Sequence, residues 1–122
     1  MYFLYLRIEG KNLDFKHISE TINICGAKCV HKEMYDVWQA GIEIAEKANI
    51  NEKVVNFIDK LYEIKQFIIE LAENANLSLW LNIYADDMQI NVNIPRDAIK
   101  KICQLSLSFD ISIMNLGDFY MA

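Results

Sequence analysis

Alternating apolar and polar residues predict the strands of this chain. In residues 2–9, Leu4, Leu6 and Ile8 fall on one side of an extended segment, and the residues between them fall on the other. The same period of two recurs further along the chain. The predicted strands are residues 2–9, 27–32, 35–45, 77–84, 89–94 and 108–115. In the last predicted strand, three apolar residues are expected to point inward: Phe109, Ile111 and Ile113.

Apolar positions spaced by three and four residues predict helices between these strands. The predicted helices are residues 14–24, 51–75 and 95–105. Asp14 is placed to cap the first helix, and Gly26 is placed to end it. Pro95 fits the first turn of the last helix, where its missing N–H costs least.

Strands and helices therefore follow the order βαββαβ, then βαβ. This order predicts an α+β fold, in which a ferredoxin-like βαββαβ unit is extended by a further βαβ, with a mainly antiparallel sheet and helices on one face. No stretch rich in Pro, Gly or Ser divides the 122 residues, so we expect a single domain over residues 1–122. A turn is predicted at Asp86-Asp87, and residues 117–122 are expected to form a loose tail.

Residues 3–19 read FLYLRIEGKNLDFKHIS, an aromatic strand that ends R-I-x-G and is followed by L-D and a short helix with I-S. This opening resembles an uncharacterised bacterial family, domain of unknown function 4279, whose members tend to begin in this way. The segment around Trp38, the long middle helix and the closing LSLSFDIS at residues 105–112 are also similar. The resemblance covers nearly the whole chain.

The chain departs from the family pattern at Ile24-Cys25-Gly26, where members usually have a Leu-Gly turn and then a polar loop containing proline. Here Ala27 and Lys28 follow directly. The resemblance implies the fold and a bacterial, cytoplasmic origin. It implies no catalytic residue, because the family has no accepted ones. By analogy with other small acidic proteins, it motivates the hypothesis of an immunity partner of a secreted toxin.

The charge balance narrows the expected partners. The net charge is −5 and the pI about 4.9, so a basic protein suits this chain better than a phosphate backbone does. At 53% hydrophobic residues the chain can build a core, but no apolar run approaches the roughly 20 residues of a membrane span. Residues 1–10 lack the pattern of a secretory signal, and the odd number of cysteines does not suggest a disulfide framework. We therefore expect a cytoplasmic protein.

Candidate catalytic and metal-binding residues are sparse. Cys25, Cys29 and His31 form C-x3-C-x-H, and His17 lies in the first predicted helix, but this spacing matches no common zinc signature. The sequence contains no G-x-S-x-G, no P-loop and no G-x-G-x-x-G motif. We therefore expect no metal, no cofactor and no catalytic activity.

The longest predicted helix offers the first candidate surface. Its apolar residues gather on one side, and carboxylates lie on the opposite side with Phe67 among them, where a partner could bury that ring. The predicted partner-binding residues are Glu52, Asp59, Glu63, Phe67 and Glu70. Lys65 falls near the middle of the apolar side, so it either snorkels along its stem or pairs with a carboxylate such as Asp110.

The second candidate surface is the sheet face opposite the aliphatic core. Its predicted site residues are Phe3, Tyr5, Arg7, Trp80 and Tyr84, accompanied by Asn91, Asn93, Asp110 and Ser112. If the helices cover only the other face, this aromatic surface is free to contact a ligand, another protein or a second copy of the chain. The alternative is that the additional strands or the tail cover it.

The sequence-based hypothesis is a non-catalytic protein-binding module, specifically a bacterial immunity-type protein that neutralises a basic toxin or similar partner through the acidic helix side. The alternative hypothesis is a small-ligand or nucleic-acid binder that uses the aromatic sheet face, although the negative charge argues against nucleic acid. A homodimer would use the same face, and a third hypothesis is a cryptic enzyme whose site is assembled from distant residues without a local motif.

Overall fold

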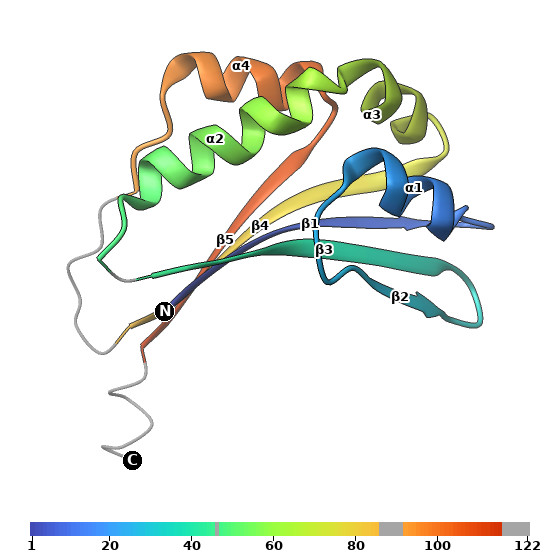
Figure 1. The fold of residues 1–122 in the computed structure, drawn as a ribbon, viewed down its shortest axis with the longest axis horizontal. Helices are drawn as coiled ribbons and strands as arrows, with labels where there is room; N and C mark the ends of the chain where they lie inside the picture. Colours follow the sequence, from blue (N-terminus) through green and yellow to red (C-terminus); the bar gives the residue numbers. More distant parts are fainter. Residues whose placement is uncertain (46, 86–91, 116–122) are drawn as a thin grey trace.

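A computed structural model describes residues 1–45, 47–85 and 92–115. In these residues five strands form one sheet, and four helices lie along one of its two faces (Figure 1). The elements are, in chain order, β1 (Tyr2–Gly10), α1 (Phe15–Ile22), β2 (Lys28–His31), β3 (Asp36–Ile44), α2 (Ile50–Glu63), α3 (Lys65–Ala72), β4 (Ala75–Ala85), α4 (Arg96–Gln104) and β5 (Ser108–Asn115).

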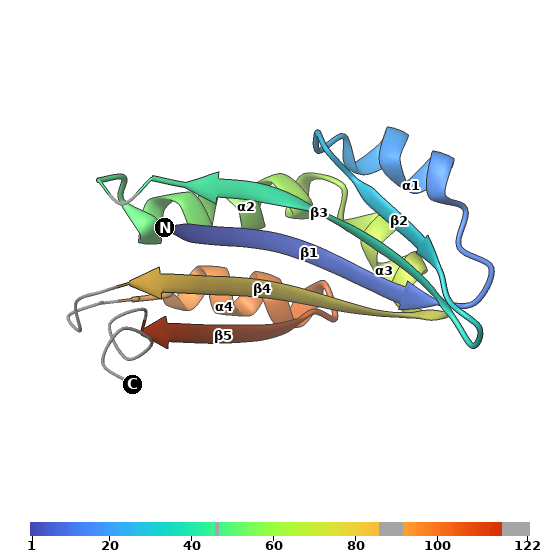
Figure 2. The same cartoon turned by 90° about the horizontal axis from the view of Figure 1, so that it is seen from below.

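The strand order across the sheet is β2-β3-β1-β4-β5. β1 pairs antiparallel with β3 and β4, β2 pairs antiparallel with β3, and β5 pairs parallel with β4. The crossover through α4 explains the parallel pair, because parallel neighbours need a connection that returns to the same end of the sheet. The predicted α+β class, the mainly antiparallel sheet and the placement of the helices on one face are confirmed (Figure 2).

The core lies between the sheet and the helices, and β1 is at its centre. Leu4, Leu6 and Ile8 are fully buried, and each such aliphatic side chain stabilises the fold by about 1.5–3 kcal/mol when it leaves water. Four residues of β4 continue the layer: Leu77, Leu79, Leu81 and Ile83. Trp38 of β3 is also fully buried, and its indole Nε1 donates a 2.9 Å hydrogen bond to Ser19 Oγ of α1. This bond satisfies the one polar atom of the buried ring.

The first helix begins where the sequence predicts and ends earlier. Asp14 accepts a 3.1 Å hydrogen bond from the His17 N–H, as an N-cap does. The helix stops at Ile22, and the next residue, Asn23, has φ 54° and ψ 50°. Asparagine tolerates this left-handed conformation, so it ends the helix in place of the predicted Gly26.

The predicted helix over residues 51–75 is wrong, because it is two helices. Ile64 lies between α2 and α3 with φ −112° and ψ 33°, and its N–H bonds to the Leu61 carbonyl at 3.1 Å, in a tighter turn than an α-helix makes. No Gly or Pro marks the break in the sequence. α3 leaves the axis of α2 and lies beside α1 and β4 (Figure 1).

The additional strand predicted at residues 89–94 is not found in its described part. Residues 92–95 have no regular secondary structure. The N–H of Asn93 donates to Asn51 Oδ1 at 2.8 Å, which ties this segment to the start of α2 instead of to a sheet. Outside the described residues lie the predicted turn at Asp86-Asp87, residues 89–91 with Asn91, and the tail at residues 117–122.

β5 has the predicted bounds, but its inward residues are less buried than predicted. Phe109 is half-buried, whereas Ile111 is 46% exposed and Ile113 is 60% exposed. β5 is an edge strand, so it has a neighbour on one side only. The prediction of burial along the whole strand is therefore wrong, since alternation tells which side a residue takes and not whether a helix covers it.

Gly41 of β3 allows an unusually close approach of two strands. It lies directly opposite Tyr5 of β1. A Cβ atom at this position would be 2.2 Å from the Leu4 carbonyl oxygen and 2.4 Å from Tyr5 Cβ. Opposite Cβ atoms in an antiparallel pair are ordinarily about 4.5–5.5 Å apart, so only glycine fits here.

We expect Gly41→Ala to lower the free energy of unfolding by about 1–3 kcal/mol, because the added methyl group must push β1 and β3 apart. Urea denaturation measures this change. Gly26→Asn is the matched control: a Cβ at Gly26 meets nothing within 4 Å, and asparagine tolerates the φ of +75° at that position. Equal stability of Gly41→Ala and wild type would contradict the close approach.

Candidate binding surface

The face of the sheet that carries no helix presents two pairs of aromatic rings from β1 and β4. Tyr5 and Trp80 are register partners, and their rings are stacked with centroids 6.3 Å apart and planes 5° from parallel. Phe3 and Tyr84 form the second pair, edge to face, with centroids 6.0 Å apart. All four rings are half-buried. Figure 2 shows that these strands lie in front of the helices when the molecule is seen from this side.

We call this surface the open face and define it by the described strand residues whose side chains alternate away from the core. Its aromatic members are Phe3, Tyr5, Trp80 and Tyr84, as the sequence predicts. The prediction that Asn93 belongs to this face is wrong. Asn93 is not in a strand, and its N–H donates to Asn51 Oδ1 at the start of α2. No helix or strand among the described residues covers the open face. Paired aromatic rings on such a face offer apolar area that a partner can bury.

Hydrogen bonds within the open face orient its side chains. Trp80 Nε1 donates to Ser78 Oγ at 2.9 Å. Asn82 Nδ2 donates to the Tyr5 hydroxyl at 3.4 Å, across the two central strands. These bonds restrict the side chains of Trp80 and Asn82, so that contact with another molecule here would cost less side-chain entropy.

The charges of the open face are mixed and slightly acidic. Arg7 Nε donates to Glu9 Oε1 at 2.6 Å, so this arginine is already paired within its own strand. The register places three further charged residues on this face. Glu43 of β3 lies opposite Phe3 of β1, and Asp110 of β5 lies beside Trp80 of β4. Lys28 of β2 lies opposite Gln39 of β3. The described part of the face thus carries the two cations Arg7 and Lys28 against the three carboxylates Glu9, Glu43 and Asp110.

A hollow of about 470 Å³ lies on the open face around Gly41. Its walls include the rings of Phe3, Tyr5 and Tyr84, and Asn82 also lines it. The remaining polar and charged residues at this hollow are Gln39, Glu43, Lys28 and Cys25. Gly41 itself borders the hollow, at the point where β1 and β3 approach closely. The volume lies within the range of about 300–1,000 Å³ that is usual for small-molecule sites.

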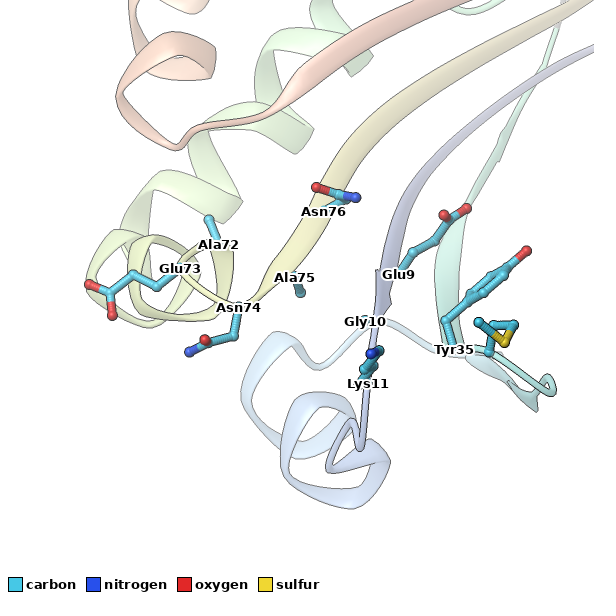
Figure 3. Close-up of a pocket in the computed structure, with 10 residues that line it drawn as sticks. Glu9, Gly10, Lys11, Tyr35, Ala72, Glu73, Asn74, Ala75 and Asn76 are labelled. Carbon is cyan, nitrogen blue, oxygen red and sulfur yellow. The ribbon is translucent and has the colours of Figure 1, made fainter.

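A larger hollow of about 770 Å³ lies where β1 ends and β4 begins. Its polar residues do not converge: Figure 3 shows Glu73 and Asn74 on one side of the strands and Glu9 with Tyr35 on the other. A binding or catalytic site needs polar groups that point at one place. This hollow therefore has the size of a site without the geometry of one.

The acidic helix side does not have the arrangement that the sequence predicts. Because the helix breaks at Ile64, Phe67 leaves the row of carboxylates. It packs against the core and contacts the His17 ring edge to face, with centroids 5.4 Å apart. Glu52, Glu63 and Glu70 are exposed.

Asp59, the remaining carboxylate of that predicted surface, is engaged within the molecule. It accepts a 2.5 Å hydrogen bond from Lys101 Nζ of α4, and this bond raises the pKa of Lys101. Lys101 Nζ also lies 5.3 Å from the centre of the Tyr62 ring. Lys65 Nζ lies 5.0 Å from the centre of the same ring. Of its two predicted alternatives, the pairing with Asp110 is not among the ion pairs of the described residues.

His31 and Asp36 form a pair that sequence analysis missed. His31 Nδ1 lies 2.7 Å from Asp36 Oδ1, across the register of β2 and β3. The Leu13 N–H donates to the other oxygen, Asp36 Oδ2, at 3.0 Å. The side chain of Asp36 is 12% exposed, whereas that of His31 is 75% exposed. The hydrogen bond from His31 is the main cause that holds the pKa of Asp36 below its usual value.

An imidazole oriented by a carboxylate is half of a general-base arrangement, and the other half would be a nucleophile or a substrate pocket beside it. Among the described residues, no hydroxyl or thiol is hydrogen-bonded to His31, and none of the hollows described above includes it. Nor do three or more His, Cys, Asp or Glu side chains gather in a way that could hold a metal ion in that part of the chain. Cys25, Cys29 and Cys103 are free and exposed.

The family model for "Domain of unknown function (DUF4279)" matches residues 1–116. The chain belongs to this family. The membership agrees with the resemblance of the opening strand, the middle helix region and the closing strand, and it assigns no activity. No curated protein and no solved structure matches the chain. Within the described residues, no helix is both long enough and apolar enough to cross a bilayer.

The acid stability of the fold tests the Asp36 pair. Because the folded pKa of Asp36 is lowered, its stabilising contribution is complete above the unfolded value of about 3.9 and is lost as pH falls through the folded value. We expect the urea midpoints of wild type and Asp36→Asn to differ by a constant amount near neutral pH and to converge below about pH 4. A difference that persists undiminished at about pH 2 would contradict this assignment.

The exposure of the two tryptophans tests the open face. Trp38 is fully buried and Trp80 is half-buried on the open face. We expect acrylamide to quench one emitting population in the free protein and to leave the other protected. Trp80→Phe should remove the quenchable population and leave only the protected one, as measured by Stern–Volmer plots. If the emission of Trp80 is as protected as that of Trp38, the open face is covered in solution.

Proposed function

We propose that this protein is a non-catalytic binding module whose working surface is the open face, and that its partner is a basic protein. The observation that carries the proposal is the pair of aromatic contacts, Tyr5–Trp80 and Phe3–Tyr84, on a sheet face that no described helix or strand covers. Aromatic residues held in place at the centre of a surface are typical binding anchors.

The charges favour a basic protein over the other occupants. The net charge of −5 repels a phosphate backbone, and the paired Arg7 is not available as a free cation for nucleic acid. A second copy would bring the same slightly acidic face against itself, because a two-fold interface pairs identical patches. A basic protein is not repelled by the negative charge of this chain, and opposite charges would accelerate its encounter with the open face.

The acidic helix side is the weaker surface for such a partner. Its proposed anchor, Phe67, already packs on the core and on His17, and Asp59 is engaged with Lys101. The hypothesis of an immunity-type protein that neutralises a basic toxin is one form of the present proposal, with the open face in place of the helix side as the surface of contact.

The test is affinity capture from a lysate of the native host, followed by binding measurements on the purified partner. We expect Trp80→Ser to weaken binding by about 30-fold or more, the loss that corresponds to an anchor residue of about 2 kcal/mol. Asn82→Lys, which adds a cation beside Tyr5 without removing a ring, is the second variant and should also weaken binding of a basic partner. Isothermal titration calorimetry gives both dissociation constants.

Glu63→Lys is the matched control, because it changes the charge of an exposed residue on α2, away from the open face. We expect it to leave affinity within about two-fold of wild type, as exposed charges distant from an interface do. Circular dichroism melting shows that each variant is folded. The proposal fails if Glu63→Lys abolishes binding while Trp80→Ser and Asn82→Lys bind as wild type does.

A further inference from the structure

The hollow around Gly41 has two ends of different chemistry. At one end the register aligns Glu43 of β3, Phe3 of β1 and Asn82 of β4 in a single row. At the other end Lys28 of β2 lies opposite Gln39 of β3. Glu43 is four residues beyond Gln39 along β3, a backbone distance of roughly 13 Å at the usual rise of a strand. This backbone separation exceeds the screening length of about 8–10 Å at physiological salt.

The Glu43 end has the groups that a guanidinium binds. Phe3 and Tyr84 form an edge-to-face pair with centroids 6.0 Å apart, and both rings line the hollow. Aromatic faces attract cations. Glu43 is exposed and forms no ion pair with any residue that the structure describes. Its carboxylate is therefore free to accept hydrogen bonds from an incoming cation.

Asn82 adds a second acceptor at the same end. Its Nδ2 donates to the Tyr5 hydroxyl. This bond uses the amide nitrogen, so the side-chain oxygen of Asn82 can accept a hydrogen bond from another group. A guanidinium carries five N–H donors in one plane, so it can bond a carboxylate and an amide oxygen while its face stacks on a ring. An ammonium has no flat face for such stacking. The hollow of about 470 Å³ that these residues line provides the room.

We propose that this end of the hollow, bounded by Phe3, Tyr84, Glu43 and Asn82, receives an arginine side chain of the protein partner. The inference rests on the proposed function for its partner, but the pocket itself is testable without one. The pocket adds specificity to the aromatic surface, because a neutral side chain would leave the carboxylate and the amide oxygen unpaired.

The first test uses a small probe, n-butylguanidinium, in a titration followed by backbone amide shifts in ¹⁵N-labelled protein. We expect saturable shifts at Phe3, Gly41 and Asn82, and no saturable shifts with the neutral analogue n-butylurea. Equal shifts with both probes, or saturable shifts only elsewhere in the chain, would overturn the proposal.

Two charge variants sharpen this titration. Glu43→Gln keeps the shape of the pocket and removes its charge, so we expect it to weaken the binding of n-butylguanidinium by about two- to five-fold, the strength of an exposed ion pair. Lys28→Gln is the matched control at the other end of the hollow and should not weaken binding. The proposal is also overturned if the affinities of wild type and Glu43→Gln are the same.

The purified partner separates this inference from the proposed function. If Trp80→Ser and Asn82→Lys lower the affinity for the partner and Glu43→Gln does not, the open face is the interface and the proposal of an arginine pocket is wrong. The pocket is supported if Glu43→Gln also lowers the affinity for the partner and one arginine of the partner accounts for that loss. In that case, replacing this arginine by Gln does not lower the affinity of the Glu43→Gln variant any further. If Trp80→Ser, Asn82→Lys and Glu43→Gln all bind as wild type does, both proposals fail.

Discussion

The burial of Leu4, Leu6 and Ile8 on β1 is the constraint on which the rest of this structure depends. β1 is the central strand, with β3 on one side and β4 on the other, so its register sets the faces of both neighbours. Successive residues of a strand point to opposite faces. Once these three aliphatic residues face the helices, Phe3 and Tyr5 must face away from them. The aromatic surface is therefore a direct consequence of how the core is built.

The same register brings together groups that are distant in sequence. Tyr5 meets Trp80, and Glu43 meets Asn82 across Phe3, only because β1 is hydrogen-bonded to both β3 and β4. Gly41 makes a further difference, since its missing side chain lets β1 and β3 approach closely beside the hollow that the aromatic residues line. The proposed binding surface thus arises from strand pairing, with no motif that a search for catalytic patterns would detect. Its chemistry is that of recognition: rings, amides and carboxylates on a rigid sheet.

Helix packing changed the other candidate surface. The row of carboxylates with Phe67 among them requires one straight helix, and the break at Ile64 removes that condition. α3 instead packs beside α1, where Phe67 gains a contact with His17 and joins the edge of the core. Likewise Asp59 faces α4, where Lys101 pairs with it. In both cases a side chain that looks free on a helical projection is used by a neighbouring element, because tertiary contacts outweigh the small preference for an uninterrupted helix.

The sequence by itself determined the five strands β1 to β5 in their order, most residues of the core face, and the aromatic residues of the open face, but it also predicted a strand at residues 89–94 and one continuous helix over residues 51–75. It did so because periods of two and of three to four residues are local and can be read without knowing what packs against them. Only the tertiary structure decided the break at Ile64, the His31–Asp36 pair and the hollow at Gly41. It also decided the exposure of Ile111 and Ile113, which lie on the edge strand β5. These features depend on which elements become neighbours, and that is settled by the packing of the whole sheet and its helices, not by any one segment.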